Sequence, residues 1–137
     1  MSIGCDRDFG LSPEFSQIEK EMTLWAKIHK FPLNVTFELT PFCNFKCPMC
    51  YVRLDPARAA KQGKMMSGEQ WLEIMRQTKE MGTLFVTLTG GEPFMHPDFW
   101  EIYEGAVEMG MLVTIYSNAS LINERIVERL KKNPPTI

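Results

Sequence analysis

The sequence predicts an α/β fold in which parallel strands alternate with helices. Three strand-like segments, at residues 34–40 (NVTFELT), 84–89 (LFVTLT) and 111–116 (MLVTIY), are each followed by a segment that reads as a helix. Capping residues and glycines mark where these helices start and stop. A β-α-β-α-β-α order of this kind predicts a parallel sheet with right-handed crossovers.

An amphipathic helix is expected before the first strand. Ser12 and Pro13 supply an N-cap and a proline at the first helical position. The apolar side chains that follow recur at three- and four-residue steps, at Phe15, Ile18, Met22, Trp25 and Ile28. Their charged neighbours balance, which argues against a membrane-surface role. We expect this helix to pack against the main domain, so that residues 1–33 form an N-terminal extension and residues 34–137 the core.

Two helices of the core have clear boundaries in the sequence. The first opens at Ser67, where Gln70 completes a capping box, and closes at Gly82. The second begins at Asp98 and ends at Gly110. Each lies between two strand-like segments, as a crossover helix must.

The last helix and the residues after it predict an incomplete barrel. Asn123 caps this helix, which stops before the Asn-Pro-Pro run at residues 133–135. Thr136 and Ile137 read as the start of a fourth strand. Three βα units leave a parallel sheet with an unpaired edge, and an eight-unit barrel needs about 250 residues. We therefore expect the chain to be a fragment of a larger protein.

Composition narrows the class of protein. The chain has 137 residues, of which 45% are hydrophobic and 23% charged, which is typical of one globular domain or a large part of one. A net charge of -2 without a basic stripe argues against nucleic-acid binding, and no apolar run approaches the roughly 20 residues of a membrane span. Residues 1–10 lack the apolar core of a secretory signal, so we expect a cytoplasmic protein. In that compartment clustered cysteines favour metal or redox chemistry over disulfides, whereas the distant Cys5 reads as an incidental thiol.

Three cysteines directly after the first strand are the main functional signal. Cys43, Cys47 and Cys50 have the spacing CxxxCxxC. Three thiolates can hold three irons of a cubane cluster and leave the fourth iron open to a reacting molecule. A structural zinc site normally needs a fourth ligand, which His29, His96 or Cys5 could supply only by accident of folding. An electron-carrying cluster needs a fourth cysteine, and none follows at ferredoxin spacing. Both alternatives are weaker.

A glycine-rich loop follows the second strand, at residues 89–93 (TGGEP). Adjacent glycines let backbone groups approach a ligand closely, since no Cβ intervenes. Because the carboxyl ends of parallel strands meet at one edge of the sheet, this loop and the cysteine loop should open on the same mouth. The pair of motifs resembles the signature of the radical S-adenosylmethionine superfamily, and the resemblance covers residues 34–137.

The resemblance implies a fold and a chemistry. The fold would be the N-terminal half of a partial (βα)6 barrel, similar to part of a TIM barrel. A 4Fe–4S cluster would be ligated by Cys43, Cys47 and Cys50. Its open iron would chelate S-adenosylmethionine, which an electron from a flavodoxin- or ferredoxin-type donor would cleave to a 5′-deoxyadenosyl radical. That radical would abstract hydrogen from the substrate.

The resemblance also implies cofactor contacts. The methionyl amino group is expected beside Gly90, Gly91 and Glu92. Met49 occupies the position before the third cysteine, where the family usually has an aromatic residue near the adenine, and a thioether can still contact a ring. Ser117 and Asn118 end the third strand at the same mouth, either as cofactor- or substrate-facing groups or as a turn before the next helix.

Three weaker candidates remain. Glu38 lies on the strand face opposite Phe37 and points into the barrel or serves as a structural carboxylate. His96 is expected to have a structural role in a helix-entry turn. The loop after the cysteines carries four cations that either face an acidic group or are solvated: Arg53, Arg58, Lys61 and Lys64.

The local sequences around both motifs predict the class of substrate. The segment at residues 38–41 (ELTP) and the later GGEP are similar to members that modify peptides or protein side chains and carry a cysteine-rich C-terminal domain of the SPASM type. A cofactor-biosynthesis enzyme resembling the molybdopterin-pathway GTP cyclase is the alternative. A third reading is an inactive, truncated fragment that binds an iron–sulfur cluster.

Overall fold

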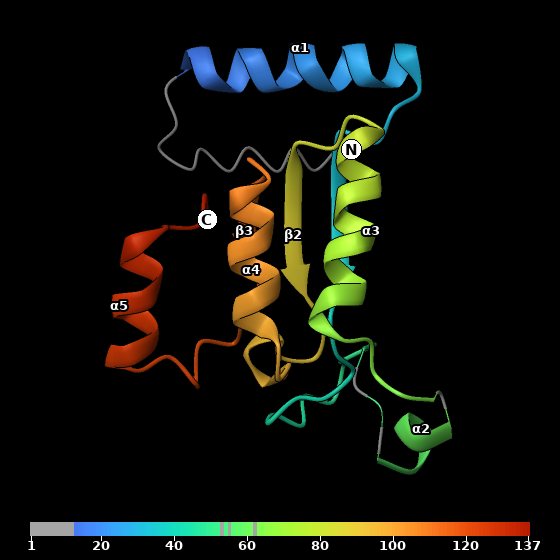
Figure 1. Ribbon diagram of the computed structural model, residues 1–137, viewed down its shortest axis with the longest axis vertical. Helices are drawn as coiled ribbons and strands as arrows, with labels where there is room; N and C mark the ends of the chain where they lie inside the picture. The colour runs from blue at the N-terminus through green and yellow to red at the C-terminus, as the bar shows by residue number, and fades with distance from the viewer. Residues whose placement is uncertain (1–12, 53, 55, 62) are drawn as a thin grey trace.

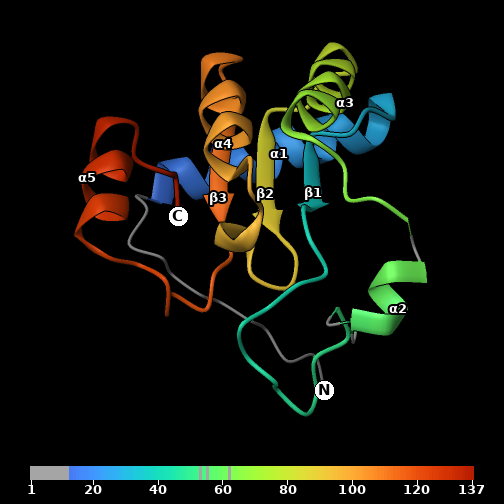
Figure 2. The same ribbon diagram turned by 60° about the horizontal axis from the view of Figure 1, so that its bottom comes forward.

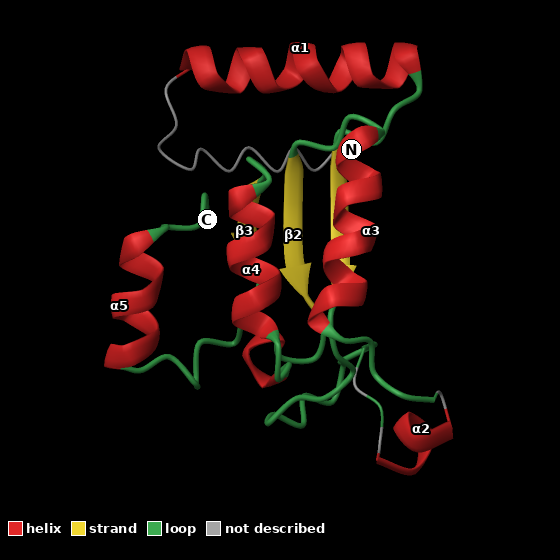
Figure 3. Cartoon of the chain, viewed as in Figure 1, coloured by secondary structure: helices red, strands yellow, loops and turns green. Residues whose placement is uncertain are grey.

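The computed structural model describes residues 13–52, 54, 56–61 and 63–137. Its helices and strands alternate along the chain as the sequence predicts (Figures 1 and 3). In order, they are α1 (Pro13–His29), β1 (Asn34–Glu38), α2 (Pro56–Lys61), α3 (Gly68–Glu80), β2 (Phe85–Thr89), the 3-10 helix η1 (Pro93–Met95), α4 (Phe99–Glu108), β3 (Leu112–Ile115) and α5 (Glu124–Lys132). The strands are one or two residues shorter than predicted, and neither the short α2 nor η1 was predicted.

The sheet has three parallel strands in the order β1-β2-β3. Register places Val35 beside Val86 and Val86 beside Val113 on one face. Helices α3 and α4 lie on a single side of the sheet (Figures 1 and 2). The core forms between that face and the two helices, from Phe37, Leu39, Met75, Val86, Leu88, Phe99, Ile102, Tyr103, Ala106, Met111 and Val113.

The opposite face of the sheet carries a row of threonines at its centre, with Asn34, Phe85 and Leu112 aligned at its amino-terminal end. Thr36, Thr87 and Thr114 are aligned across the three strands by the register, and none of them is buried. Glu38 continues this face toward the carboxyl end of β1 and is exposed. Strand alternation therefore sends the core side chains of the strands toward the helices, and the threonines and Glu38 to the other side.

Local capping fixes the ends of the core helices, as predicted. Ser67 and Gln70 form a reciprocal capping box at the start of α3, and the Oδ1 atom of Asn123 accepts from the Ile126 amide at the start of α5. Asp98 precedes α4 but makes no cap with its own helix. Its carboxylate accepts from the Gly68 amide at 2.9 Å, so it joins the start of α4 to the start of α3.

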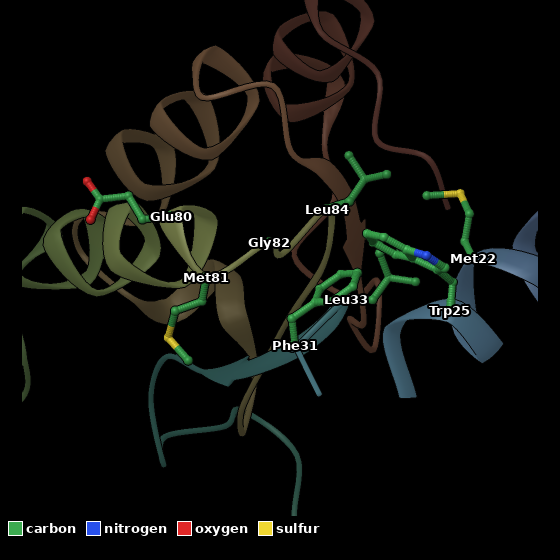
Figure 4. A pocket seen from close by; sticks show the side chains of 8 residues that line it. All are labelled: Met22, Trp25, Phe31, Leu33, Glu80, Met81, Gly82 and Leu84. Atoms are coloured by element: carbon green, nitrogen blue, oxygen red, sulfur yellow. The ribbon is translucent and has the colours of Figure 1, made fainter. Parts of the chain in front are cut away.

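Helix α1 differs from the prediction. It exists, but the apolar side chains that we expected to pack are mostly exposed: Ile18 at 54%, Trp25 at 57% and Ile28 at 65%. The reason is placement, since α1 runs across the amino-terminal end of the sheet and not over a face (Figure 1). Met22 and Trp25 line an open pocket of about 460 Å³ together with Phe31, Leu33 and Leu84 (Figure 4). The predicted cap at Ser12 lies outside the described residues.

The segment after α5 pairs with the outer edge of β3. The Thr136 amide donates to the Val113 carbonyl at 2.7 Å, and the Ile115 amide donates to the Ile137 carbonyl at 2.9 Å. Residues 136–137 are not assigned as a strand, and these two bonds hold them against the edge of β3. None of the helices in the described part of the chain is both long and apolar enough to cross a bilayer.

Candidate functional site

Three loops meet at the carboxyl ends of the strands. The cysteine loop follows β1, the Gly-Gly-Glu loop follows β2, and residues 116–123 follow β3 (Figure 2). The β1–β2 ladder continues into the first two of these loops, because the Gly91 amide donates to the Thr40 carbonyl at 2.7 Å and the Glu92 amide to the Phe42 carbonyl at 2.8 Å. These two hydrogen bonds therefore fix the backbone at Thr40 and Phe42, directly before Cys43.

The two glycines are required by that junction. A Cβ on Gly90 would lie 2.5 Å from the Thr40 carbonyl oxygen, and the backbone φ of Gly90 is +139°, which side chains disfavour. A Cβ on Gly91 would lie 2.2 Å from the Phe42 carbonyl oxygen. In the structure both glycines let the backbone lie close to the chain leading into Cys43. Their expected approach to a ligand stays a prediction.

Glu92 ties the second loop to the third. Its side chain is fully buried, at 0% exposure. One carboxylate oxygen accepts from the Ser117 hydroxyl at 2.8 Å and from the Phe94 amide at 3.3 Å, and the other accepts from the Asn118 amide at 2.8 Å. The structure thus brings together Glu92, Ser117 and Asn118, as the sequence predicted, and satisfies the buried carboxylate within the chain.

The third loop reaches the first cysteine. The side-chain nitrogen of Asn118 lies 3.6 Å from the Cys43 sulfur and 3.0 Å from the Asn44 side-chain oxygen. The Phe45 amide donates to the same sulfur at 3.3 Å. Cys43 is half-buried and has two N–H donors, an environment typical of sulfur that ligates an iron–sulfur cluster.

The other two cysteines are exposed. Cys47 and Cys50 are free thiols joined only through the backbone, where the Cys50 amide donates to the Cys47 carbonyl at 3.2 Å. Within the described residues no three or more His, Cys, Asp or Glu side chains are gathered as a metal site. The donor set itself, three thiolates on one loop, suits the soft ligation of an iron–sulfur cluster. Cluster ligation by the three cysteines stays a prediction.

The structure also describes Met49, Glu38 and His96, the other candidates from the sequence. Met49 is 92% exposed, so its contact with adenine stays a prediction. Glu38 accepts from the Tyr51 hydroxyl at 3.4 Å beside a pocket of about 290 Å³. His96 is structural, as predicted: its Nδ1 accepts from the Asp98 amide at 3.1 Å, so its Nε2 carries the proton and faces the Met66 carbonyl at 3.0 Å.

The role of the four loop cations and of the isolated cysteine is not tested by the described residues. Arg58, Lys61 and Lys64 are exposed, and their role stays a prediction. Arg53 and Cys5 lie outside the described residues.

Sequence reasoning missed Asn44, whose side-chain nitrogen donates to the Ser120 hydroxyl at 2.7 Å. The only feature of the sequence that could have indicated it is the position of this side-chain amide, directly after the first cysteine.

Comparisons with known proteins identify relatives over most of the chain. Residues 37–137 match the sequence profile of the Radical SAM superfamily. A PqqA peptide cyclase from Granulibacter bethesdensis is 37% identical over 101 residues, which are 74% of this chain and 26% of that protein. A PqqA peptide cyclase from Bradyrhizobium diazoefficiens is 30% identical over 112 residues, which are 81% of this chain and 28% of that protein. The chain thus spans little more than a quarter of the length of these relatives.

Solved structures of SuiB resemble this chain over most of its length. SuiB of Streptococcus suis bound to its precursor peptide SuiA superposes with a TM-score of 0.64 and 30% sequence identity, over 85% of this chain and 26% of that chain. SuiB bound to S-adenosylmethionine superposes with a TM-score of 0.59 and 29% identity, over 85% of this chain and 25% of that chain. These likenesses confirm the predicted fold class: three parallel strands and their helices match part of a larger α/β barrel.

Proposed function

The chain belongs to the radical S-adenosylmethionine superfamily, and from this premise we propose that the protein is an iron–sulfur enzyme that modifies a peptide or a protein side chain. The observation that carries the proposal is the junction in which the cysteine loop, the Gly-Gly-Glu loop and the loop after β3 are hydrogen-bonded to one another. A peptide substrate is supported by relatives named for the peptide PqqA and by SuiB, which was solved with a precursor peptide. No contact in the described residues favours the GTP-cyclase alternative.

The three cysteines are the groups that would hold the cofactor. Cys43, Cys47 and Cys50 would ligate a 4Fe–4S cluster through their thiolates, and the two N–H donors at Cys43 fit that role. When bound, the cluster supplies one-electron reductive cleavage of S-adenosylmethionine to a 5′-deoxyadenosyl radical. The electron would come from a flavodoxin- or ferredoxin-type donor.

The chain's own residues would bind and orient S-adenosylmethionine. A carboxylate offers about four lone-pair positions, and donors of the chain take three of those on Glu92. One acceptor position on Glu92 is left for the methionyl ammonium group. Because the side chain is fully buried, binding of that group requires Ser117 and Asn118 to move enough to expose the carboxylate. Gly90 and Gly91 let the backbone of the Gly-Gly-Glu loop lie against the cysteine loop. Met49 and Tyr51, both almost fully exposed, are available to contact the adenine.

Anaerobic reconstitution with iron and sulfide tests cluster binding. The expected result is about four irons and four sulfides per chain, as one 4Fe–4S cluster requires. Cys43→Ala, Cys47→Ala and Cys50→Ala should each abolish the visible absorption of the cluster. Cys5→Ala is the matched control, since it removes a thiol outside the motif and should leave iron binding unchanged. Stoichiometric zinc with no iron uptake would overturn the assignment.

Cleavage of S-adenosylmethionine tests the enzymatic part. The reconstituted full-length protein, reduced with dithionite, should release 5′-deoxyadenosine, measured by liquid chromatography and mass spectrometry. Glu92→Asp, which keeps the charge but withdraws it by one methylene, should raise the S-adenosylmethionine concentration needed for half-maximal cleavage. No 5′-deoxyadenosine from a protein with a full complement of iron would rule out radical chemistry.

A further inference from the structure

We propose that Asn118 is a positioning residue for the iron–sulfur cluster, which acts by donating its side-chain N–H to the Cys43 sulfur and not by contacting S-adenosylmethionine. The inference rests on the proposed function and assigns to Asn118 a different role from the cofactor-facing one that the sequence suggested. It concerns how the first cysteine is held before and after the cluster is bound.

The orientation of the Asn118 amide is determined by its neighbours. Its side-chain oxygen accepts from the Ser120 backbone amide at 2.9 Å and from the Ser120 hydroxyl at 2.6 Å. A backbone N–H can only donate, so the atom facing Ser120 must be the oxygen. The NH₂ group then has to point the other way, toward the Cys43 sulfur at 3.6 Å and the Asn44 oxygen at 3.0 Å. A flipped amide would place an acceptor against both.

The donor is also held rigidly. The Asn118 backbone amide donates to the fully buried Glu92 carboxylate at 2.8 Å. The next residue, Ala119, has a backbone φ of +61°, and its amide is bonded to the Ser117 hydroxyl at 2.9 Å. A tight turn in the left-handed region persists only when its surroundings impose it. The amide is therefore fixed by the backbone on one side and by Ser120 on the other.

The second partner of the amide closes the arrangement around the cysteine. Asn44 accepts from Asn118 through its oxygen and donates to the Ser120 hydroxyl at 2.7 Å through its nitrogen. Asn44, Asn118 and Ser120 thus form a ring of side-chain hydrogen bonds that clamps the chain immediately after Cys43. Cys47 and Cys50 are exposed and lie further along the loop. Cys43 is consequently the cysteine whose position the fold sets in advance.

The consequence for the cluster is a higher reduction potential. An N–H donor at a ligating sulfur stabilises the additional negative charge of the reduced cluster, and hydrogen bonds to the sulfurs are one of the factors that set the potential. Removing the donor should shift the potential to a more negative value. Placing a carboxylate there should shift it further, since a negative charge beside the sulfur opposes reduction.

The first test is an equilibrium redox titration of the reconstituted protein, followed by electron paramagnetic resonance of the reduced cluster. Asn118→Leu removes the donor without adding charge, and Asn118→Asp removes it and adds a negative charge. The expected potentials decrease in the order wild type, Asn118→Leu, Asn118→Asp. The matched control is Asn123→Asp, which adds the same charge on the same loop and retains the cap of α5. Potentials and spectra unchanged in both Asn118 variants at full iron content would overturn the proposal.

The second test uses the protein without iron, so that it is independent of cluster binding. Alkylation by iodoacetamide, mapped by mass spectrometry, gives a separate rate for each of Cys43, Cys47 and Cys50. The thiolate is the form that iodoacetamide alkylates, and the Asn118 N–H stabilises negative charge on the Cys43 sulfur. Asn118→Leu removes that donor and should slow alkylation of Cys43 severalfold relative to Cys47 and Cys50. An unchanged ratio of rates would refute the contact. Failure to bind iron together with a changed ratio would refute the proposed function and leave the contact established.

Discussion

Replacing Gly91 with alanine is the sharpest test of the junction that places the cysteine loop. The added methyl carbon would lie 2.2 Å from the Phe42 carbonyl oxygen, 2.5 Å from its carbon and 3.0 Å from the Pro41 carbonyl oxygen. Ordinary contacts between such atoms are about 3.3 Å or longer. The backbone of the glycine loop and that of the cysteine loop must therefore move apart by about 1 Å.

The cost follows from the two hydrogen bonds that cross this junction. At 2.7 and 2.8 Å they would lengthen beyond the normal limit of about 3.2 Å for an amide–carbonyl bond. Each bond contributes about 1 kcal/mol to the free energy of unfolding, and leaving the buried Thr40 carbonyl unpaired adds about 1 kcal/mol more. Restriction of the unfolded chain by alanine offsets roughly 0.5 kcal/mol. We expect Gly91→Ala to lower the free energy of unfolding by about 2–3 kcal/mol.

Urea unfolding measures that loss, and hydrogen exchange locates it. The amides of Gly91 and Glu92 should exchange faster in Gly91→Ala. The control is Gly110→Ala, which strains a backbone with a φ of +77° but meets nothing within 4 Å. It should cost about 1 kcal/mol and leave exchange at the junction unchanged. Equal exchange at Gly91 and Glu92 in wild type and Gly91→Ala would show that the junction does not depend on the close approach.

Three further changes probe the loop after β3, the buried carboxylate and a surface ion pair. Ala119→Gly should raise the free energy of unfolding by about 1 kcal/mol, measured in urea, because glycine relieves the left-handed φ of +61°. Glu92→Gln should lower it by about 2 kcal/mol, since an NH₂ group would face a donor of the chain; an unchanged midpoint would contradict that account. Glu73 has its pKa lowered from 4.5 to about 2, first by its hydrogen bond from Arg76. The contribution of Glu73 to stability should be complete above pH 4.5 and decline as the pH falls toward 2, and Arg76→Gln should return the pKa toward 4.5 in an NMR titration.

Much of the fold is encoded locally and was predictable. The capping box of Ser67 and Gln70 and the cap at Asn123 are interactions between residues three apart, so the sequence shows them directly. The alternation of strands and helices predicted the parallel sheet, and the motifs after the first two strands predicted which loops carry the site. The structural role of His96 in the turn before α4 was also predicted correctly.

Features that depend on distant contacts were not predicted correctly. The apolar stripe of α1 suggested close packing, but Trp25 stays 57% exposed because the helix meets the end of the sheet. The close approach of Gly91 to the Phe42 carbonyl was not predicted, and the expected approach of this glycine to a ligand stays a prediction. The contact of Asn118 with Cys43 joins residues 75 positions apart, and no periodicity or spacing records it.

The sequence by itself determined the alternating elements, the CxxxCxxC and Gly-Gly-Glu motifs, and hence the family, because each is a pattern within one short stretch of chain. Only the tertiary structure decided that the glycines bond to the strand exit, that Glu92 is held by the loop after β3, and that Cys43 has donors that fix its position. These outcomes depend on the parallel register, which brings loops about 25 to 75 residues apart to one edge of the sheet. Register results from packing of the whole sheet against α3 and α4, so it cannot be derived from any single segment.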